Sequence, residues 1–582
     1  MPVTADAAIA GLGMTSLGRV YGSSPRRLAA SAVRLAAADA GMTLSDLDGL
    51  LICPGITGGL EVGLASQLGL HDLALLAVVN SFGASAATAV QVAAQAVASG
   101  AARVVACVFA DTPLREGLPA GSAFGRGADA NAAGPPERNG LHGLTAGYGF
   151  NSVTAYYALA ARRHMERFGT TSEQLGSIAV AQRQWAAGNP DAQYRDPISL
   201  ADHQNSRWVA EPLHLLDCSL VSNGAIAVIV TSATAAADGP RPPVHVWGWG
   251  QGHPGQPMAV GSEFGLVTGA AQAGRAAMHR AGIRPADVTM CQIYDCYTYT
   301  VLVTLEDYGF CGKGEGGPFA ASGAFAPGGS LPVNTGGGQL SAYYMWGFTP
   351  LSEAVIQARG DGGDRQSPAT DVILVSGNGG ILAHHGTLIV SPHQRVSPRT
   401  TRPEPSPALA ADPASHGVAA AAREEAQANP REDRTWPCLA GPDQMGVVRP
   451  DPRSEAFFAA ADEDALTLRR CDGCAAWLPP TASGCPGCAD DEELSWARAS
   501  GQGTLVSWSV VHPRDGGPVL VPALIELAEG PWISTGLQLE SPEQLGTLRA
   551  GEPVAVEFVH PDAGASYPVF RPVVSSECAQ AQ

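Results

Sequence analysis

Four cysteines in the C-terminal part of the chain have the spacing of a metal site. Cys471 and Cys474 form one CxxC pair, and Cys485 and Cys488 form a second pair after the intervening residues 475–484. Four thiolates brought together by two tight turns give the tetrahedral sulfur set that structural Zn²⁺ prefers. Because all four ligand positions are filled, no open position remains for water or substrate. We predict one structural zinc ion in a rubredoxin-like ribbon.

The charged residues limit the other kinds of chemistry. Lys313 is the only lysine, and it stands in a glycine-rich stretch, whereas Schiff-base catalysis needs a buried lysine. The 582 residues carry 35 basic and 54 acidic side chains, a net charge of −19. Such an acidic chain is unfavourable for binding nucleic acid, so no nucleic-acid partner is expected.

The chain has no sign of a secreted or membrane-spanning protein. Its N-terminus lacks the basic start of a signal peptide, and no run of 18 apolar residues occurs. Apart from the four clustered cysteines, the thiols are scattered, which argues for reduced cysteines instead of a disulfide framework. We expect a cytoplasmic protein with no membrane partner.

The elements that must position any site follow an α/β pattern. Up to about residue 395, helix-period stretches alternate with short apolar runs such as Ala101–Asp111 and Asp371–Ser376, which predicts buried strands. The pattern repeats: Ala-Gly at 40–41 and 281–282 each ends an Ala-rich helix and precedes an apolar strand. This repeat predicts a duplicated half-domain.

Two changes of composition set the domain boundaries. The stretch after residue 395 is rich in Pro, Ala, Arg, Glu and Ser and reads as a linker, and alternating strands of a small barrel follow the zinc ribbon. The predicted boundaries are 1–239 and 240–395 for the two α/β halves, 396–449 for the linker, 450–492 for a helix with the zinc ribbon, and 493–575 for the barrel.

Several stretches resemble the thiolase superfamily, most closely the sterol-carrier-linked thiolases and lipid-transfer-type thiolase-like proteins. They are 161–175, 212–230, 294–319, 331–341 and 375–380. The resemblance implies the five-layered αβαβα thiolase fold and a homodimer. The C-terminal part is similar to the zinc-ribbon plus OB-fold domain that accompanies thiolase-like proteins and acyl-CoA hydratases. It implies a coenzyme A thioester as substrate, whose site this domain helps to form or cover, and a docking hydratase.

The residues on which thiolase chemistry depends are replaced. The family pattern Asn-x-x-Cys-x-Ser reads Asn-Ser-Phe-Gly-Ala-Ser at 80–85, with Gly83 in the cysteine position. Tyr344 stands in place of the family histidine, and Gly377 in place of the second cysteine. Without a thiolate no acyl-enzyme forms, so covalent thiolysis or Claisen condensation is not expected.

Two serines and a Gly-His-Pro-Gly segment are further candidates for catalytic groups. Ser81 and Ser85 have no histidine in the general-base position to activate them. A literal Gly-His-Pro-Gly occurs at 252–255, but it follows a strand before the second-half repeat and reads as a turn.

The resemblance implies an aldolase of the kind that shortens steroid side chains. Such an enzyme cleaves a 3-hydroxyacyl-CoA into a ketone and a shortened acyl-CoA by retro-aldol chemistry, without a covalent cysteine intermediate. The reaction needs a base for the β-hydroxyl, donors for the thioester enolate and a proton for its α-carbon. The alternatives are a C–C bond-forming or acyl-transfer enzyme of secondary metabolism, and a non-catalytic acyl-CoA or lipid carrier.

Two tyrosines and one carboxylate are the predicted catalytic groups. Tyr344 is the first because it replaces the histidine, Tyr294 is the second because it ends a strand, and Asp295 is expected to orient Tyr294 or act as the base. The loss of a side chain at Gly83 is expected to leave room for a bulky ring system. The expected substrate-binding residues are Gly83, Asn334, Gly337, Gly338, Gly377 and His384.

Overall fold

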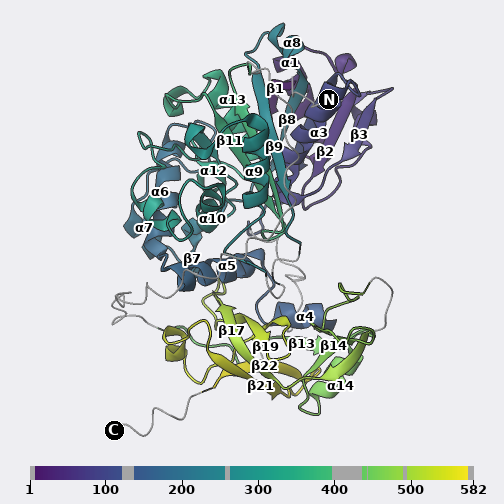
Figure 1. The fold of residues 1–582 in the computed structure, drawn as a ribbon, viewed down its shortest axis with the longest axis vertical. Coiled ribbons are helices and arrows are strands. Elements are labelled where there is room, and N and C mark those ends of the chain that lie inside the picture. Colours follow the sequence, from purple (N-terminus) through teal and green to yellow (C-terminus); the bar gives the residue numbers. More distant parts are fainter. Residues whose placement is uncertain are drawn as a thin grey trace.

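The computed structural model describes residues 7–120, 137–255, 258, 262–395, 436–441, 444–488 and 494–573. Figure 1 shows an α/β body made from the first 395 residues and a smaller, mainly β body made from the C-terminal part. Most of the predicted linker, 396–449, lies outside the described residues. No helix in the described ranges is long and apolar enough to cross a membrane.

The α/β body contains two similar halves joined in one sheet of order β10-β11-β12-β9-β1-β8-β4-β2-β3. The halves meet where β1 pairs with β9, through Ala8 with His245 and Ile9 with Val244. The first half contains β1 (Ala7–Met14), β2 (Gly49–Pro54), β3 (Leu75–Val78), β4 (Val104–Asp111) and β8 (Gly224–Ser232). The second contains β9 (Val244–Gly252), β10 (Met290–Gln292), β11 (Ile373–Gly379) and β12 (His384–Ser391).

Helices cover both halves and separate them. α3 (Ser85–Ser99) and α13 (Phe348–Arg359) pack against strands of both halves and form the central layer. α1 (Pro25–Asp39) covers the first half, and α9 (Ala270–Ala281) covers the second. From the shared middle outward, β9, β12, β11 and β10 of the second half follow the order of β1, β8, β4 and β2 of the first, and β3 has no counterpart in the described second half. The αβαβα thiolase fold is confirmed.

A helical insertion between β4 and β8 lies on the side of the second half. It consists of α4 (Gly140–Gly147), α5 (Val153–Phe168), α6 (Ser172–Ala187) and α7 (Leu200–Asn205). α6 packs on α10 (Thr298–Tyr308) and on the short helix α12 (Gly338–Ser341). α5 is buried along most of its length, because the C-terminal body covers it from the other side.

The C-terminal body combines a ribbon with a five-stranded barrel. The ribbon has the order β15-β14-β16 and is accompanied by α14 (Glu455–Ala461). Its strands are β14 (Thr467–Cys471), β15 (Trp477–Leu478) and β16 (Leu494–Arg498). The barrel, of order β20-β19-β17-β21-β22, consists of β17 (Gln502–Trp508), β19 (Pro522–Leu527), β20 (Trp532–Gly536), β21 (Pro553–Val559) and β22 (Tyr567–Pro572). Together they confirm the predicted OB-fold with a ribbon.

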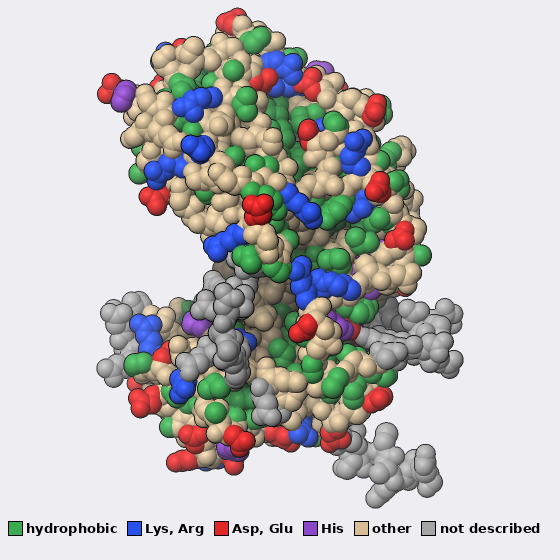
Figure 2. Space-filling view, turned by 180° about the vertical axis from the view of Figure 1, so that it is seen from behind, with side chains coloured by type: hydrophobic (Ala, Val, Ile, Leu, Met, Phe, Trp, Pro, Cys, Tyr) green, Lys and Arg blue, Asp and Glu red, His purple; other side chains and the backbone are tan. Residues whose placement is uncertain are grey.

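Backbone hydrogen bonds tie the two bodies together. β18 (Val510–Val511) of the C-terminal body pairs with β6 (Trp208–Glu211), which also pairs with β7 (Leu213–His214). β13 (Val447–Arg449) pairs with β5 (Glu137–Asn139). In Figure 2, acidic side chains gather on the end of the C-terminal body that is farthest from the α/β body. Such a face repels a polyanion.

Candidate active site

Two tyrosine hydroxyls meet where the first and second halves face each other. Tyr294 follows β10, Tyr344 follows α12, and their hydroxyl oxygens lie 3.2 Å apart in a shared hydrogen bond. Burial raises the pKa of both phenols, and the neighbouring phenol raises the pKa of Tyr294 further. Both groups are therefore neutral, proton-carrying phenols at neutral pH.

The ring of Tyr294 lies where a side chain at position 83 would stand. A Cβ on Gly83 would be 2.3 Å from Cε2 and 2.4 Å from Cζ of Tyr294, and 2.1 Å from the carbonyl oxygen of Asn378. The glycine that replaces the thiolase cysteine is therefore needed to admit the phenol. The expectation that Gly83 leaves room for a bulky substrate is wrong, because Tyr294 fills that space.

Gly377 makes a similarly close approach from the other half. A Cβ on Gly377 would lie 2.6 Å from the carbonyl oxygen of Gly83. Both positions that carry cysteines in thiolases therefore serve here as points of backbone contact, and neither has a side chain to offer a substrate.

The buried carboxylate of Asp295 binds the start of α12. Its carboxylate accepts hydrogen bonds from the backbone N–H groups of Gln339 (2.9 Å) and Leu340 (3.3 Å) and from the Gln339 side chain (3.2 Å). It thereby caps the first turn of α12, and burial raises its pKa to about 7. The carboxylate thus holds the helix that leads to Tyr344, and its predicted role as the base, or as the group that orients Tyr294, stays a prediction.

The predicted binding glycines shape the same loop. Gly338 has φ of +60°, and a Cβ there would lie 2.1 Å from Asp295 Oδ2. Gly337 has φ of +93°, and a Cβ there would lie 2.5 Å from the Cβ of Ala186 in α6. Asn334 Oδ1 accepts a hydrogen bond of 2.6 Å from the backbone N–H of Ile293. These residues form the loop, and their contact with substrate stays a prediction.

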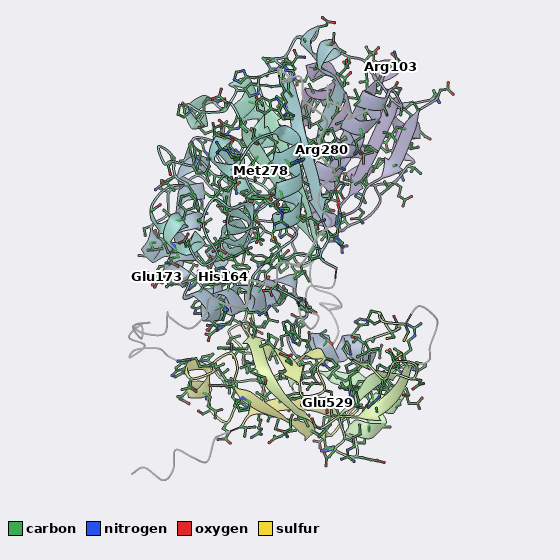
Figure 3. The ribbon with its side chains drawn as sticks, in the orientation of Figure 1. Arg103, His164, Glu173, Met278, Arg280 and Glu529 are labelled. Atoms are coloured by element: carbon green, nitrogen blue, oxygen red, sulfur yellow. The ribbon has the colours of Figure 1, made fainter. Side chains whose placement is uncertain are left out.

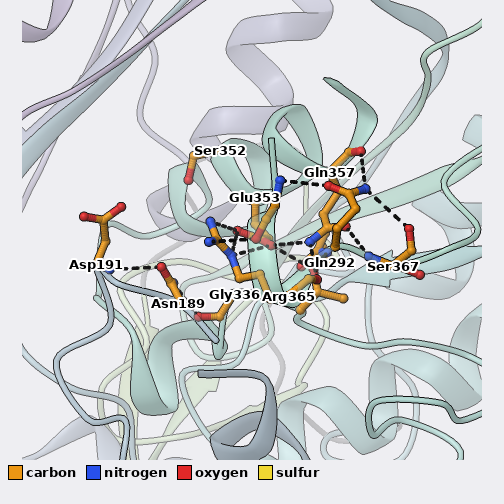
Figure 4. A network of polar contacts seen from close by, with 12 residues as sticks. Asn189, Asp191, Gln292, Gly336, Ser352, Glu353, Gln357, Arg365 and Ser367 are labelled. Atoms are coloured by element: carbon orange, nitrogen blue, oxygen red, sulfur yellow. Dashed lines mark hydrogen bonds and ion pairs between the residues drawn. The ribbon is translucent and has the colours of Figure 1, made fainter. Parts of the chain in front are cut away.

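A buried polar network holds this loop from behind (Figure 4). Glu353 of α13 binds Arg365 at 3.1 Å and accepts a hydrogen bond of 2.9 Å from Thr335 Oγ1. The amide of Gln292 donates to Thr335 Oγ1 at 2.8 Å, and that of Asn189 donates to the carbonyl of Gly336 at 2.7 Å. The loop that carries Tyr344 is thus fixed by side chains from several elements.

His384 lies beside the exposed ring of Phe82. Its ring stacks on Phe82 with 6.3 Å between centroids and 12° between planes, and Phe82 is 46% exposed. His384 Nδ1 lies 3.1 Å from Nδ1 of His253. Gly252 of the Gly-His-Pro-Gly segment ends β9, and the histidine that follows it contacts His384.

Sequence reasoning missed a second tyrosine pair beside the first. The rings of Tyr157 and Tyr297 pack with 4.6 Å between centroids, and Thr154 shares a hydrogen bond of 2.8 Å with the Tyr297 hydroxyl. The Asn378 side chain donates to the Tyr157 hydroxyl at 3.5 Å, while its buried Oδ1 has no hydrogen-bond partner within the described residues. Tyr297 lies in the stretch 294–319 and Asn378 in the SGNGG segment, which were both noted in the sequence, whereas Tyr157 belongs to no motif.

The arrangement is suited to acid and base chemistry without a covalent intermediate. Two neutral phenols in contact can pass a proton between them.

The four predicted zinc ligands meet in the ribbon. The Sγ atoms of Cys471, Cys474, Cys485 and Cys488 all lie within 4.8 Å of one another. Four sulfurs at this spacing fit a tetrahedral metal ion with closed coordination.

Two family models match the chain. The thiolase C-terminal domain-like family matches residues 250–392, and the family of the ChsH2 C-terminal OB-fold domain matches residues 496–559. These matches agree with the two bodies of the structure.

Characterised proteins and solved structures are also similar. A steroid side-chain-cleaving aldolase of Thermomonospora curvata is 39% identical over 382 residues, which cover 64% of this chain and 95% of that protein. A 17-hydroxy-3-oxo-4-pregnene-20-carboxyl-CoA lyase of Mycobacterium tuberculosis is 39% identical over 388 residues, 65% and 97% of the two chains.

Among solved structures, an Ltp2-ChsH2(DUF35) aldolase has a TM-score of 0.59 at 36% identity and covers 67% of this chain and 98% of its own. A monomeric SCP2-thiolase-like protein of Mycobacterium smegmatis has a TM-score of 0.61 at 16% identity, over 97% of this chain and 99% of its own, a likeness of fold alone.

Replacement of Gly83 by alanine is expected to displace Tyr294, because the added methyl group overlaps its ring and the backbone of Asn378. A displacement of about 1 Å lowers a turnover rate by about 100-fold. The loss is measured as the decrease in the turnover rate of a 3-hydroxyacyl-CoA. Gly441→Ala, where a Cβ meets no atom within 4 Å, is the control. Full activity of Gly83→Ala would contradict the overlap.

Replacement of Arg365 by methionine should destabilise the α/β body by about 3–5 kcal/mol, because it leaves the buried Glu353 without its partner. Urea unfolding followed by circular dichroism measures the loss. Arg241→Met is the matched control: Arg241 binds Asp39 at 37% side-chain exposure, and its loss should cost about 1 kcal/mol or less. Equal losses for the two variants would rule out the bracing role of the Glu353 network.

Proposed function

The chain belongs to the thiolase-superfamily aldolases that cleave steroid side chains, and on this premise we propose how its two buried tyrosines carry out the cleavage. The protein is a carbon–carbon lyase. Its substrate is a 3-hydroxyacyl-CoA, and its products are a ketone and a shortened acyl-CoA. The hydroxyl pair of Tyr294 and Tyr344, packed against Gly83 where a thiolase has its nucleophile, is the observation that carries the proposal.

The reaction divides into one proton removed and one proton returned. As the β-hydroxyl loses its proton, the Cα–Cβ bond breaks, the oxygen becomes the ketone, and the bonding electrons move into the thioester as an enolate. The enolate then takes a proton at the α-carbon and becomes the shortened acyl-CoA. No net proton is gained or lost, so a proton can enter at one phenol and leave from the other across the 3.2 Å between them.

The raised pKa values of the two phenols fit this relay better than a stored phenolate. A buried phenolate is costly, so each tyrosine gives up its proton only while it receives another. The enolate oxygen needs donors during this step. We assign that role to the Asn378 side-chain amide, which donates to the Tyr157 hydroxyl at 3.5 Å and belongs to the residue whose backbone carbonyl adjoins the contact of Gly83 with Tyr294.

We propose a structural role for the metal and an assembly role for two surfaces. The four-cysteine site holds Zn²⁺ and leaves no ligand position open to substrate. The edge strand β3 exposes Leu76 (41%) and Val78 (46%), an apolar edge suited to a second copy of the chain, which gives a homodimer. An acyl-CoA hydratase is the class of enzyme that supplies a 3-hydroxyacyl-CoA, and its docking on the C-terminal body stays a proposal.

Tyr344→Phe and Tyr294→Phe are each expected to lower the turnover number for a β-tertiary-hydroxyacyl-CoA by about 10²–10⁴-fold, because each removes one end of the relay. Chromatography of the ketone and the shortened acyl-CoA measures it. Tyr343→Phe, which loses a hydroxyl bonded to Ser352 behind the loop, should stay within a few-fold of wild type. Wild-type activity in either relay variant would remove that tyrosine from the mechanism.

The purified chain is expected to contain about one zinc ion, measured by plasma mass spectrometry. Cys474→Ser should lower the melting temperature of the C-terminal body, because the metal closes the ribbon. Cys438→Ser, a change at an exposed cysteine outside the cluster, is the control. Iron at the site, seen as visible absorption from a tetrathiolate, would contradict the assignment to zinc.

A further inference from the structure

One helix separates the C-terminal body from the two tyrosine pairs. α5 lies along the boundary between the bodies, where Figure 3 labels His164 on it. Its residues 157–161 are buried, although the helix lies at the edge of the α/β body. A helix that is buried on opposite sides belongs to two packing surfaces at once.

The barrel contacts one side of α5. Ser507 Oγ of β17, fully buried, donates a hydrogen bond of 2.8 Å to the carbonyl oxygen of Leu159. The guanidinium of Arg162 lies 5.1 Å from the ring centre of Trp508, and that of Arg163 lies 5.0 Å from the ring centre of Trp532. These contacts fix both the height of the helix and its rotation about its own axis.

The opposite side of α5 faces the site. Tyr157 is two positions before Leu159, about 200° away around the helix. Tyr157 packs on Tyr297 and accepts from Asn378. One turn earlier, Thr154 is hydrogen-bonded to the Tyr297 hydroxyl. Near the other end of the helix, His164 lies 3.0 Å from the buried Glu306 of α10.

A second series of contacts connects the C-terminal body to Tyr297. β18 pairs with β6, and His512 lies 2.9 Å from the Glu211 carboxylate. After β7, Asp217 accepts a hydrogen bond of 2.6 Å from Thr298 Oγ1, and the backbone of Cys218 pairs with that of Tyr297. The first route ends at Tyr157 and the second at Tyr297, and the rings of these two residues pack on each other.

We propose that the OB-fold barrel is a positioning element of the active site, and that Ser507 and Trp508 set the place of Tyr157 through α5. The inference rests on the proposed function and deepens it: Tyr157 and Asn378 form a polar wall beside the catalytic phenols. Within the described structure the buried Oδ1 of Asn378 has no hydrogen-bond partner, so it can accept a hydrogen bond from a ligand at this wall. The barrel therefore acts on the reaction without touching the reacting atoms.

A double-mutant cycle in the full chain tests this route. Trp508→Ala and Ser507→Ala are expected to lower the turnover number by about 10-fold and 3-fold, with KM changed by less than about twofold, because the wall moves by a fraction of an ångström. In a Tyr157→Phe background, the same replacements should change the turnover number by less than about twofold. Trp508→Phe, which keeps a ring beside Arg162, should restore most of the loss.

If Trp508→Ala and Ser507→Ala lower the turnover number by the same factor in the wild-type chain and in the Tyr157→Phe variant, the route through Tyr157 is overturned. Val573→Ala, at an exposed end of the barrel, is the control and should change neither constant. Ser507→Ala removes one oxygen only, so its result holds if Trp508→Ala fails to fold.

Hydrogen–deuterium exchange separates this inference from the proposed function. Trp508→Ala should speed exchange in α5 and at 296–300 while leaving β8 unchanged, and this readout does not depend on turnover. If exchange in α5 is faster in Trp508→Ala but the wild-type protein cleaves no 3-hydroxyacyl-CoA, the proposed function is wrong and the route through α5 stands. Unchanged exchange in α5 would overturn the route, whatever the activity.

Discussion

The site depends on a steric conflict: a side chain at position 83 and the ring of Tyr294 cannot both be present. A Cβ at position 83 and the ring of Tyr294 cannot occupy the same space, since they would lie 2.3 Å apart. In a thiolase-like fold this space belongs to the nucleophile at the start of the central helix. Here it belongs to a phenol that comes from the other half of the duplicated fold. One glycine therefore removes the covalent route and makes room for the acid–base route.

The rest of the α/β body holds the phenols at that contact. Asp295 caps α12 through backbone N–H groups, so the carboxylate next to Tyr294 in sequence helps to position Tyr344 instead. The ion pair of Glu353 and Arg365 braces the loop before α12 from the opposite side. These polar groups are buried and bonded, which gives the loop one arrangement and holds the two phenols in contact.

The sequence allowed the fold and the metal ligands to be predicted, because both follow from local patterns. The CxxC pairs define the ribbon, and the repeated order of helix and strand defines the two halves. Tyr294 and Tyr344 could be found because each occupies or adjoins a family position. The contact of Asp295 with the start of α12 and the filling of the space at Gly83 could not be predicted, since both depend on contacts between distant residues. Tyr157 carries no motif, and only packing brings it to Tyr297.

The central claim is cleavage through a thioester enolate by neutral phenols, with no bond between enzyme and substrate. The most direct test is turnover of a β-tertiary-hydroxyacyl-CoA in heavy water, with mass analysis of the shortened acyl-CoA and of the intact protein. We expect one deuterium at the α-carbon of the acyl-CoA and an unchanged protein mass throughout turnover. A protein that gains the mass of an acyl group, or an acyl-CoA without deuterium, would contradict the account.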